Sequence, residues 1–204
     1  AEYVHLPLAD GGEGTVEVLL KGLEGEVRQS QVMGPLGEPV MASWALLENG
    51  QTALIEFAAS SGLDLISSEH RNPAIATSFG TGELIKEALN HGVTKVLLGL
   101  GGSATNDAGA GIAQALGAKL LDNQGNEITR GGAALADVAT VDLSKTHLRS
   151  KDVEFVVACD VANPLVGENG ASHVFGPQKG ATPELVQLLD SAISHFASVS
   201  AGHT

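Results

Sequence analysis

Several residue types that mark other protein classes are scarce in this sequence. Its 204 residues contain a single cysteine, Cys159, so no disulfide can form within the chain. No apolar run approaches the roughly 18 residues needed to cross a bilayer. No basic segment followed by an apolar one marks a secretion signal. These absences favour a protein of the reducing cytoplasm, and we expect no membrane partner.

Basic and aromatic side chains are also few. Lys and Arg number 11 against 24 Asp and Glu, which gives a formal charge of −13. Sequence-independent nucleic-acid binding needs a basic surplus, so we expect no nucleic-acid partner. Aromatic residues make up 3% of the chain, whereas glycine occurs 26 times. Many tight turns and few aromatic side chains favour an α/β protein over an aromatic-rich β-sandwich.

Hydrophobic periodicity predicts a mixture of strands and helices. Five short apolar runs bounded by turn residues predict strands at 27–32, 40–47, 52–57, 95–100 and 153–159. We expect the second and third of these to form a hairpin, because a short turn sequence joins them. Apolar residues at helical spacing predict helices at 13–23, 81–91, 112–116 and 183–196. The length allows one or two domains.

A first polar cluster, Asp10-Gly-Gly-Glu-Gly-Thr15, stands where a helix is predicted to begin. Its glycines allow a close approach of the backbone to an anion, and helix N-termini favour negative charge. The same residues also fit an ordinary helix start, with Asp10 near the N-cap and Glu13 in the first turn. Spacing alone favours the helix start over a ligand site.

A second cluster, Gly101-Gly-Ser-Ala-Thr-Asn-Asp107, follows the apolar run at 95–100. It combines backbone amides, hydroxyls, a side-chain amide and a carboxylate at a strand end, where α/β proteins usually bind ligands. These groups suit phosphate or polyol binding, with the carboxylate as base or metal ligand. The glycine spacing matches neither a Walker loop nor a dinucleotide fingerprint. A tight turn capped by Asp107 is the alternative, and we favour the ligand site.

The last third of the chain supplies three more candidates. Asp160 and Asn163 follow the apolar run at 153–159, and Lys179 lies between Pro177 and Gly180. The lysine ammonium could meet a phosphate as a point charge, although an exposed surface lysine is the commoner outcome. Cys159 lies in the apolar run and is expected to be a small core residue rather than a nucleophile.

Taken in order, these segments resemble the type I glycerate kinase family, whose members phosphorylate D-glycerate with ATP and Mg²⁺. The matching segments cover most of the chain and are 9–15, 71–73, 78–85, 99–107, 158–164, 170–171 and 175–181. Many relatives carry glycine at the position of Ala108. Family members have further segments before and after the stretch matched, so we expect this chain to correspond to part of such a protein.

The resemblance implies a glycerate kinase I-like fold of two α/β domains, one inserted into a Rossmann-like host. Residues 1–24 are then expected to belong to the host and 25–204 mostly to the inserted domain. It also implies ATP and Mg²⁺ as cofactors and D-glycerate as substrate. It leaves open whether the protein forms a homo-oligomer.

For that reaction, residue chemistry suggests Asp107 as the base that takes the substrate proton or as a Mg²⁺ ligand. Asp10 and Asp160 are the next metal candidates, and Lys179 would neutralise phosphate. The expected substrate-binding set is Gly101, Gly102, Ser103, Thr105, Asn106 and Asn163. Two alternatives stay open: a kinase for another small hydroxy acid, and an inactive binding fragment of such an enzyme.

Overall fold

The computed structural model describes residues 12–202, apart from the side chains of residues 49, 148 and 149. The predictions made for Asp10 therefore lie outside the described residues. Within the described range no helix is both long enough and apolar enough to span a membrane.

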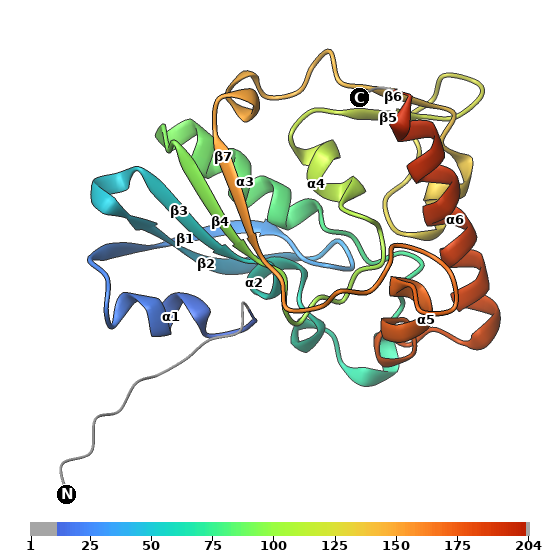
Figure 1. The fold of residues 1–204 in the computed structure, drawn as a ribbon, viewed down its shortest axis with the longest axis horizontal. Helices are drawn as coiled ribbons and strands as arrows, with labels where there is room; N and C mark the ends of the chain where they lie inside the picture. The colour runs from blue at the N-terminus through green and yellow to red at the C-terminus, as the bar shows by residue number, and fades with distance from the viewer. Residues whose placement is uncertain (1–11, 203–204) are drawn as a thin grey trace, which may run out of the picture.

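A five-stranded mixed sheet runs through the molecule in the order β1-β2-β3-β4-β7 (Figure 1). Its strands are β1 (Gly25–Met33), β2 (Pro39–Leu47), β3 (Thr52–Glu56), β4 (Lys95–Gly99) and β7 (Glu154–Ala158). The first three strands pair antiparallel, whereas β3, β4 and β7 run parallel to one another. In the register of the parallel part, Glu56 lies beside Gly99, and Gly99 beside Ala158. The carboxyl ends of three strands therefore meet at one edge of the sheet.

Each face of the sheet carries a helix, and side chains alternate between the two. The helix α3 (Phe79–His91) packs on the face that bears Trp44, Ile55 and Val96. The helix α1 (Thr15–Leu20) places Val16 on the opposite face, against Ala45 and Leu54. This alternation accounts for the continuous apolar runs of β3 and β4, because a strand buried on both faces needs apolar residues at every position.

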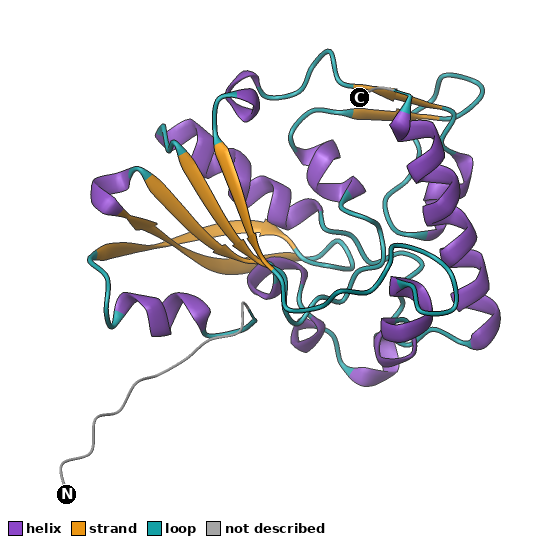
Figure 2. Ribbon diagram, in the orientation of Figure 1, coloured by secondary structure: helices purple, strands orange, loops and turns teal. Residues whose placement is uncertain are grey.

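A smaller layer lies to one side of the sheet (Figure 2) and has a core of its own. Leu120, Leu135 and Val138 pack there against Ile193. The elements that form it are α4 (Ala110–Ala115), β5 (Lys119–Leu121), η4 (Ala133–Asp137), β6 (Thr140–Asp142) and α6 (Pro183–Ala201). The strands β5 and β6 pair antiparallel as a separate two-stranded sheet.

The remaining helices are short. They are α2 (Ala58–Ser61), α5 (Ala171–Phe175), η1 (Glu48–Gly50), η2 (Leu63–Leu65), η3 (Ser68–His70), η5 (Leu148–Lys151) and η6 (Pro177–Lys179). Of these, α2 lies at the edge where the parallel strands end, and α5 lies beside α6 (Figure 1).

The predicted strands and helices are confirmed, including the hairpin between β2 and β3. The prediction for Cys159 is wrong, because this residue is exposed. It follows β7, which lies at the border of the sheet with β4 as its neighbour, so an apolar sequence there is not a sign of burial. The predicted domain division near residue 24 stays a prediction.

Candidate functional site

The candidate site lies at the carboxyl edge of the parallel strands, where backbone hydrogen bonds join the loop after β3 to the loop after β4. The Leu63 N–H donates to the Gly102 carbonyl at 2.8 Å, and the Ala104 N–H donates to the Ser61 carbonyl at 2.9 Å. Gly102 has a φ of +72°, a left-handed conformation that glycine adopts without steric cost. The predicted glycine-rich loop is therefore held in a fixed shape against α2.

Lys179 reaches this loop from the far end of the chain. Its side chain is buried, and its Nζ donates to Ser103 Oγ at 2.8 Å and to the Thr105 carbonyl at 2.6 Å. Burial lowers the pKa of Lys179 to about 8, while the charge of Asp107 acts in the opposite direction. The lysine is thus a partly desolvated cation fixed beside the glycine-rich loop, and the expectation of a solvent-exposed lysine does not apply.

Asp107 is almost fully buried and joins two helices. Its Oδ2 accepts hydrogen bonds at 2.8 Å from both the backbone N–H and the hydroxyl of Ser78, the residue before α3. Its carboxylate also accepts from the backbone N–H of Gly109 at 3.2 Å and of Gly111 at 3.3 Å. These four bonds tie the start of α3 to the start of α4, and they show the capping role that the sequence offered as the alternative to a ligand site.

The other predicted substrate residues differ in exposure. Thr105 and Asn106 are buried, and Asn106 Nδ2 donates to Ser172 Oγ of α5 at 2.9 Å. Gly101 and Ser103 are half-buried, and Gly102 is exposed. The structure therefore brings the loop at 101–107 together with Lys179 and α5.

Asp160 and Asn163 are exposed, in the segment after β7. The Asn163 side-chain amide donates to the carbonyl of Asn169 at 3.0 Å, which closes its own loop. Among residues 12–202, no three carboxylate, histidine or cysteine side chains gather closely enough to hold a metal ion. The metal-binding role of Asp160 stays a prediction.

Sequence reasoning missed Glu56, a buried carboxylate at the end of β3. Its two oxygens accept hydrogen bonds from the backbone N–H groups of Gly14, at 3.3 Å, and Val16, at 2.5 Å. It therefore fixes the end of the first polar cluster to the carboxyl edge of the sheet. The signal was available, since Glu56 is the one charge in the apolar run at 52–57.

The segments 71–73 and 175–181, both among those that resemble the glycerate kinase family, also lie in contact. The Arg71 Nη1 donates to the Gln178 carbonyl at 3.3 Å. Gly180 has a φ of +93°, and a Cβ there would lie 2.5 Å from the Arg71 carbonyl oxygen. Glycine at this position allows the loop that carries Lys179 to pack directly on the backbone of residue 71.

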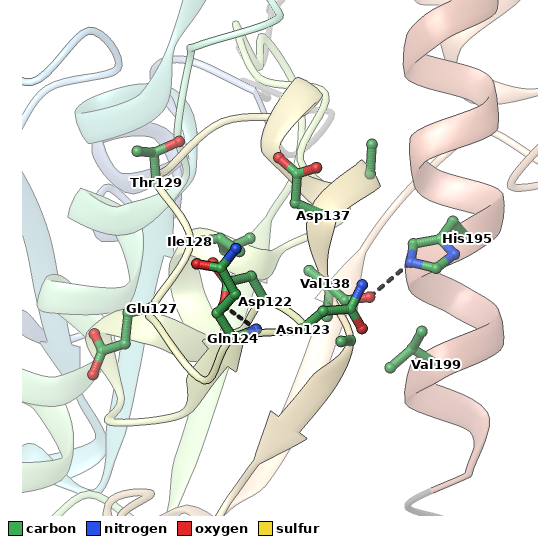
Figure 3. A pocket seen from close by; sticks show the side chains of 12 residues that line it. Asp122, Asn123, Gln124, Glu127, Ile128, Thr129, Asp137, Val138, His195 and Val199 are labelled. Atoms are coloured by element: carbon green, nitrogen blue, oxygen red, sulfur yellow. Dashed lines mark hydrogen bonds between the residues drawn. The ribbon is translucent and has the colours of Figure 1, made fainter.

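A hollow of about 660 Å³ lies elsewhere, between α6 and the loops around β5 and β6 (Figure 3). Its lining includes the carboxylates of Asp122, Glu127 and Asp137, together with His195, whose Nε2 lies 2.7 Å from the Val138 carbonyl oxygen. Asp122 already accepts backbone N–H groups, chiefly that of Asn126, which lower its pKa, and Glu127 pairs with Lys119 at 2.8 Å. None of its lining residues belongs to the glycine-rich loop or to the lysine loop, so we separate this hollow from the candidate site.

Comparison with known proteins gives a consistent result. Residues 1–204 match the model of the glycerate kinase family. The chain is 55% identical over 199 residues to the glycerate 2-kinase of Escherichia coli K12. The aligned region covers 98% of this chain and 52% of that protein. It is 52% identical over 200 residues to the glycerate kinase of Bacillus subtilis 168, again covering 98% and 52%.

A solved structure agrees with this match. The crystal structure of the "putative glycerate kinase 2" of Salmonella typhimurium LT2 superposes with a TM-score of 0.93 at 50% identity, covering 99% of this chain and 54% of that one. The chain thus spans about half the length of the relatives it matches.

Proposed function

Because this chain belongs to the glycerate kinase family, we propose that it forms part of an enzyme that transfers the γ-phosphoryl group of ATP to D-glycerate. In this reaction a hydroxyl oxygen of glycerate bonds to the γ-phosphorus and the bond to the leaving oxygen of ADP breaks. The hydroxyl proton passes to a carboxylate. A cytoplasmic location, expected from the single cysteine, is part of the same proposal.

The placement of Lys179 is the observation that carries this proposal. An ammonium group has three N–H donors, and two of them go to Ser103 Oγ and the Thr105 carbonyl. In this proposal the third donates to a phosphate or carboxylate oxygen bound beside the glycine-rich loop. A partly desolvated cation there stabilises transferred negative charge more strongly than one in bulk water.

Asp107 supports the same site through its position. Its four hydrogen bonds hold the end of the glycine-rich loop, and its negative charge helps Lys179 to stay protonated. We propose this positioning role in addition to the predicted role of base or metal ligand.

Mg²⁺ commonly uses one or two protein carboxylates together with substrate phosphates. Asp160, exposed after β7, offers one such carboxylate, so the described residues fit a magnesium site that the nucleotide itself completes. Bound there, the ion would neutralise the phosphate oxygens. Ser103, Thr105 and Asn106 would lie closest to the glycerate.

The test uses a hybrid enzyme in which this chain replaces the matched segment of the E. coli glycerate 2-kinase. ADP formation is measured with D-glycerate and with a panel of other small hydroxy acids. We expect the highest kcat/KM with D-glycerate. Lys179→Met should lower turnover by about 100-fold, as expected when one donor to a transition-state charge is lost.

The matched control is Lys86→Met, which removes an exposed lysine on α3. Equal turnover in the two variants would exclude a role for Lys179 in the reaction. Preference for another acid would favour the alternative kinase, and a hybrid that folds without turnover would favour the inactive binding fragment.

A further inference from the structure

The two border strands of the main sheet differ in chemistry. On β1, Glu26 and Arg28 form an ion pair at 2.9 Å, and Gln29 and Gln31 are exposed. Charged and polar residues of this kind protect a natural edge from pairing with further strands. On β7, by contrast, three large apolar side chains in a row are exposed, those of Phe155, Val156 and Val157. The side chains of β1 therefore protect its edge from pairing with another strand, whereas those of β7 do not.

Both faces of β7 are uncovered. Phe155 lies beside Val96, and Val156 beside Leu97 on the opposite face. Val96 is fully buried beneath α3, whereas Phe155 is 41% and Val156 38% exposed. Parallel strands are normally covered on both faces, so β7 has the sequence of an internal strand without the neighbours of one.

The uncovered region continues past the strand. Every residue from 154 to 165 is exposed, and Val161 and Leu165 add to its apolar surface. Large apolar side chains exposed together in this way are typical of an interaction site. Asp160 and Asn163, two of the predicted site residues, lie within this stretch.

We infer that β7 is an internal strand of a larger sheet, and that the next strand comes from polypeptide corresponding to the half of the family relatives that this chain does not span. That segment has uncharged, apolar side chains on both faces, and further structure from the same polypeptide covers Phe155, Val156 and Val157. The relatives are about twice as long as this chain, which supplies enough polypeptide for a strand and its covering layers.

A second copy of this chain fits the surface less well. Pairing β7 with its own symmetry mate satisfies the free backbone groups at the edge. The added strand has no covering layer on either face, so Phe155, Val156 and Val157 of both copies stay exposed to solvent. Coverage of edge and faces together requires a different polypeptide.

The test compares hydrogen exchange in the isolated chain and in the hybrid enzyme defined above. The Glu154 N–H donates to the Thr94 carbonyl, toward β4. By the two-residue period of a strand, the amides of Phe155 and Val157 point away from β4. We expect these two amides to exchange at least about 100-fold more slowly in the hybrid than in the isolated chain.

Two matched variants probe the same edge in the hybrid by thermal unfolding. Val157→Lys should lower the midpoint by several degrees, whereas Val27→Lys, at a similarly exposed position on β1, should leave it nearly unchanged. If Val157→Lys prevents folding, the exchange comparison in the unsubstituted proteins still decides.

Three results would overturn the inference. One is equal exchange of Phe155 and Val157 in the hybrid and the isolated chain. Another is equal effects of the two lysine substitutions. The third is protection that appears in the isolated chain as its concentration rises, together with dimers in sedimentation, which would assign the edge to a second copy. None of these measurements depends on kinase activity.

Discussion

Ala108 adopts a backbone conformation that favours glycine. It has a φ of 49°, in the left-handed region, at the turn between Asp107 and α4. This conformation costs an L-residue roughly 1–2 kcal/mol. Glycine avoids that cost, but it loses more conformational entropy on folding, which offsets part of the gain in stability. Ala108 therefore carries local strain immediately next to the candidate site.

We expect Ala108→Gly to raise the free energy of unfolding by about 0.5–1 kcal/mol, the balance of these two effects. Ala113→Gly, within α4, is the control and should lower it by about 1 kcal/mol. Urea unfolding of both variants measures the difference. Two losses of similar size would show that Ala108 is not strained.

The buried ammonium of Lys179 should make stability depend on pH. Its pKa is about 8 in the folded protein, lowered from 10.5 chiefly by burial. Between these values the unfolded chain binds more protons than the native one, so the free energy of unfolding rises with pH across that window. Across this window the free energy of unfolding should rise by about 3 kcal/mol more in the wild type than in a variant that lacks this lysine.

The measurement is urea unfolding of the wild type and of Lys179→Met from pH 7 to pH 10.5. We expect the difference between the two free energies to shift in favour of the wild type as pH increases. The same series with Lys86→Met supplies the baseline for an exposed lysine. A constant difference across the range would contradict a lowered pKa for Lys179.

Helices α3 and α4 depend on one shared carboxylate at their starts. Asp107 Oδ2 accepts from the Ser78 backbone, the Ser78 hydroxyl and the Gly111 backbone, while Oδ1 accepts from Gly109. An amide in its place turns one of the two acceptors into a donor that faces N–H or O–H groups. The interaction between the two helices is thus specific to a carboxylate.

Asp107→Asn should therefore lower the free energy of unfolding by about 3 kcal/mol, the cost of breaking a buried charged network. Ser78→Ala removes only the hydroxyl, which donates to Asp107 and accepts from the Ile112 N–H at 3.1 Å, and should cost about 1–2 kcal/mol. Chemical unfolding measures the free energy of unfolding of both variants, and hydrogen exchange of the Gly109 and Gly111 amides reports whether their bonds to residue 107 persist. Equal losses would mean that the backbone contacts of Asp107 contribute little.

Most helices and strands could be predicted from the sequence, because their apolar residues follow the period of the structure they form. The pair β5 and β6 was missed, since three residues per strand are too few to show a period. Glu56 was missed because its partners Gly14 and Val16 lie about forty residues away. The sequence could single out Lys179 between Pro177 and Gly180, but its burial depends on contacts with Ser103 and Thr105 that no local pattern reveals.

These 204 residues, produced alone, should fold but show little or no ATP turnover with D-glycerate. Phosphoryl transfer requires nucleotide, metal and acceptor to be held together, and the chain spans about half of the relatives it matches. A coupled ADP assay measures this, with the hybrid enzyme as the positive control. Turnover within the usual range of about 1–1000 per second would show that this chain holds a sufficient site.

The connection between β4 and β7 has a consequence for the order of folding. The strands β1, β2 and β3 pair with their neighbours in sequence, so they can assemble as soon as Glu56 has left the ribosome. The parallel pairing of Gly99 with Ala158 must wait for the whole layer of β5, η4 and β6 between them. Closing so long a loop is slow relative to hairpin formation. We therefore expect synthesis to proceed through an intermediate in which the antiparallel strands are paired and the backbone edge of β4 still lacks its neighbour β7, an unpaired edge of the kind that chaperones recognise.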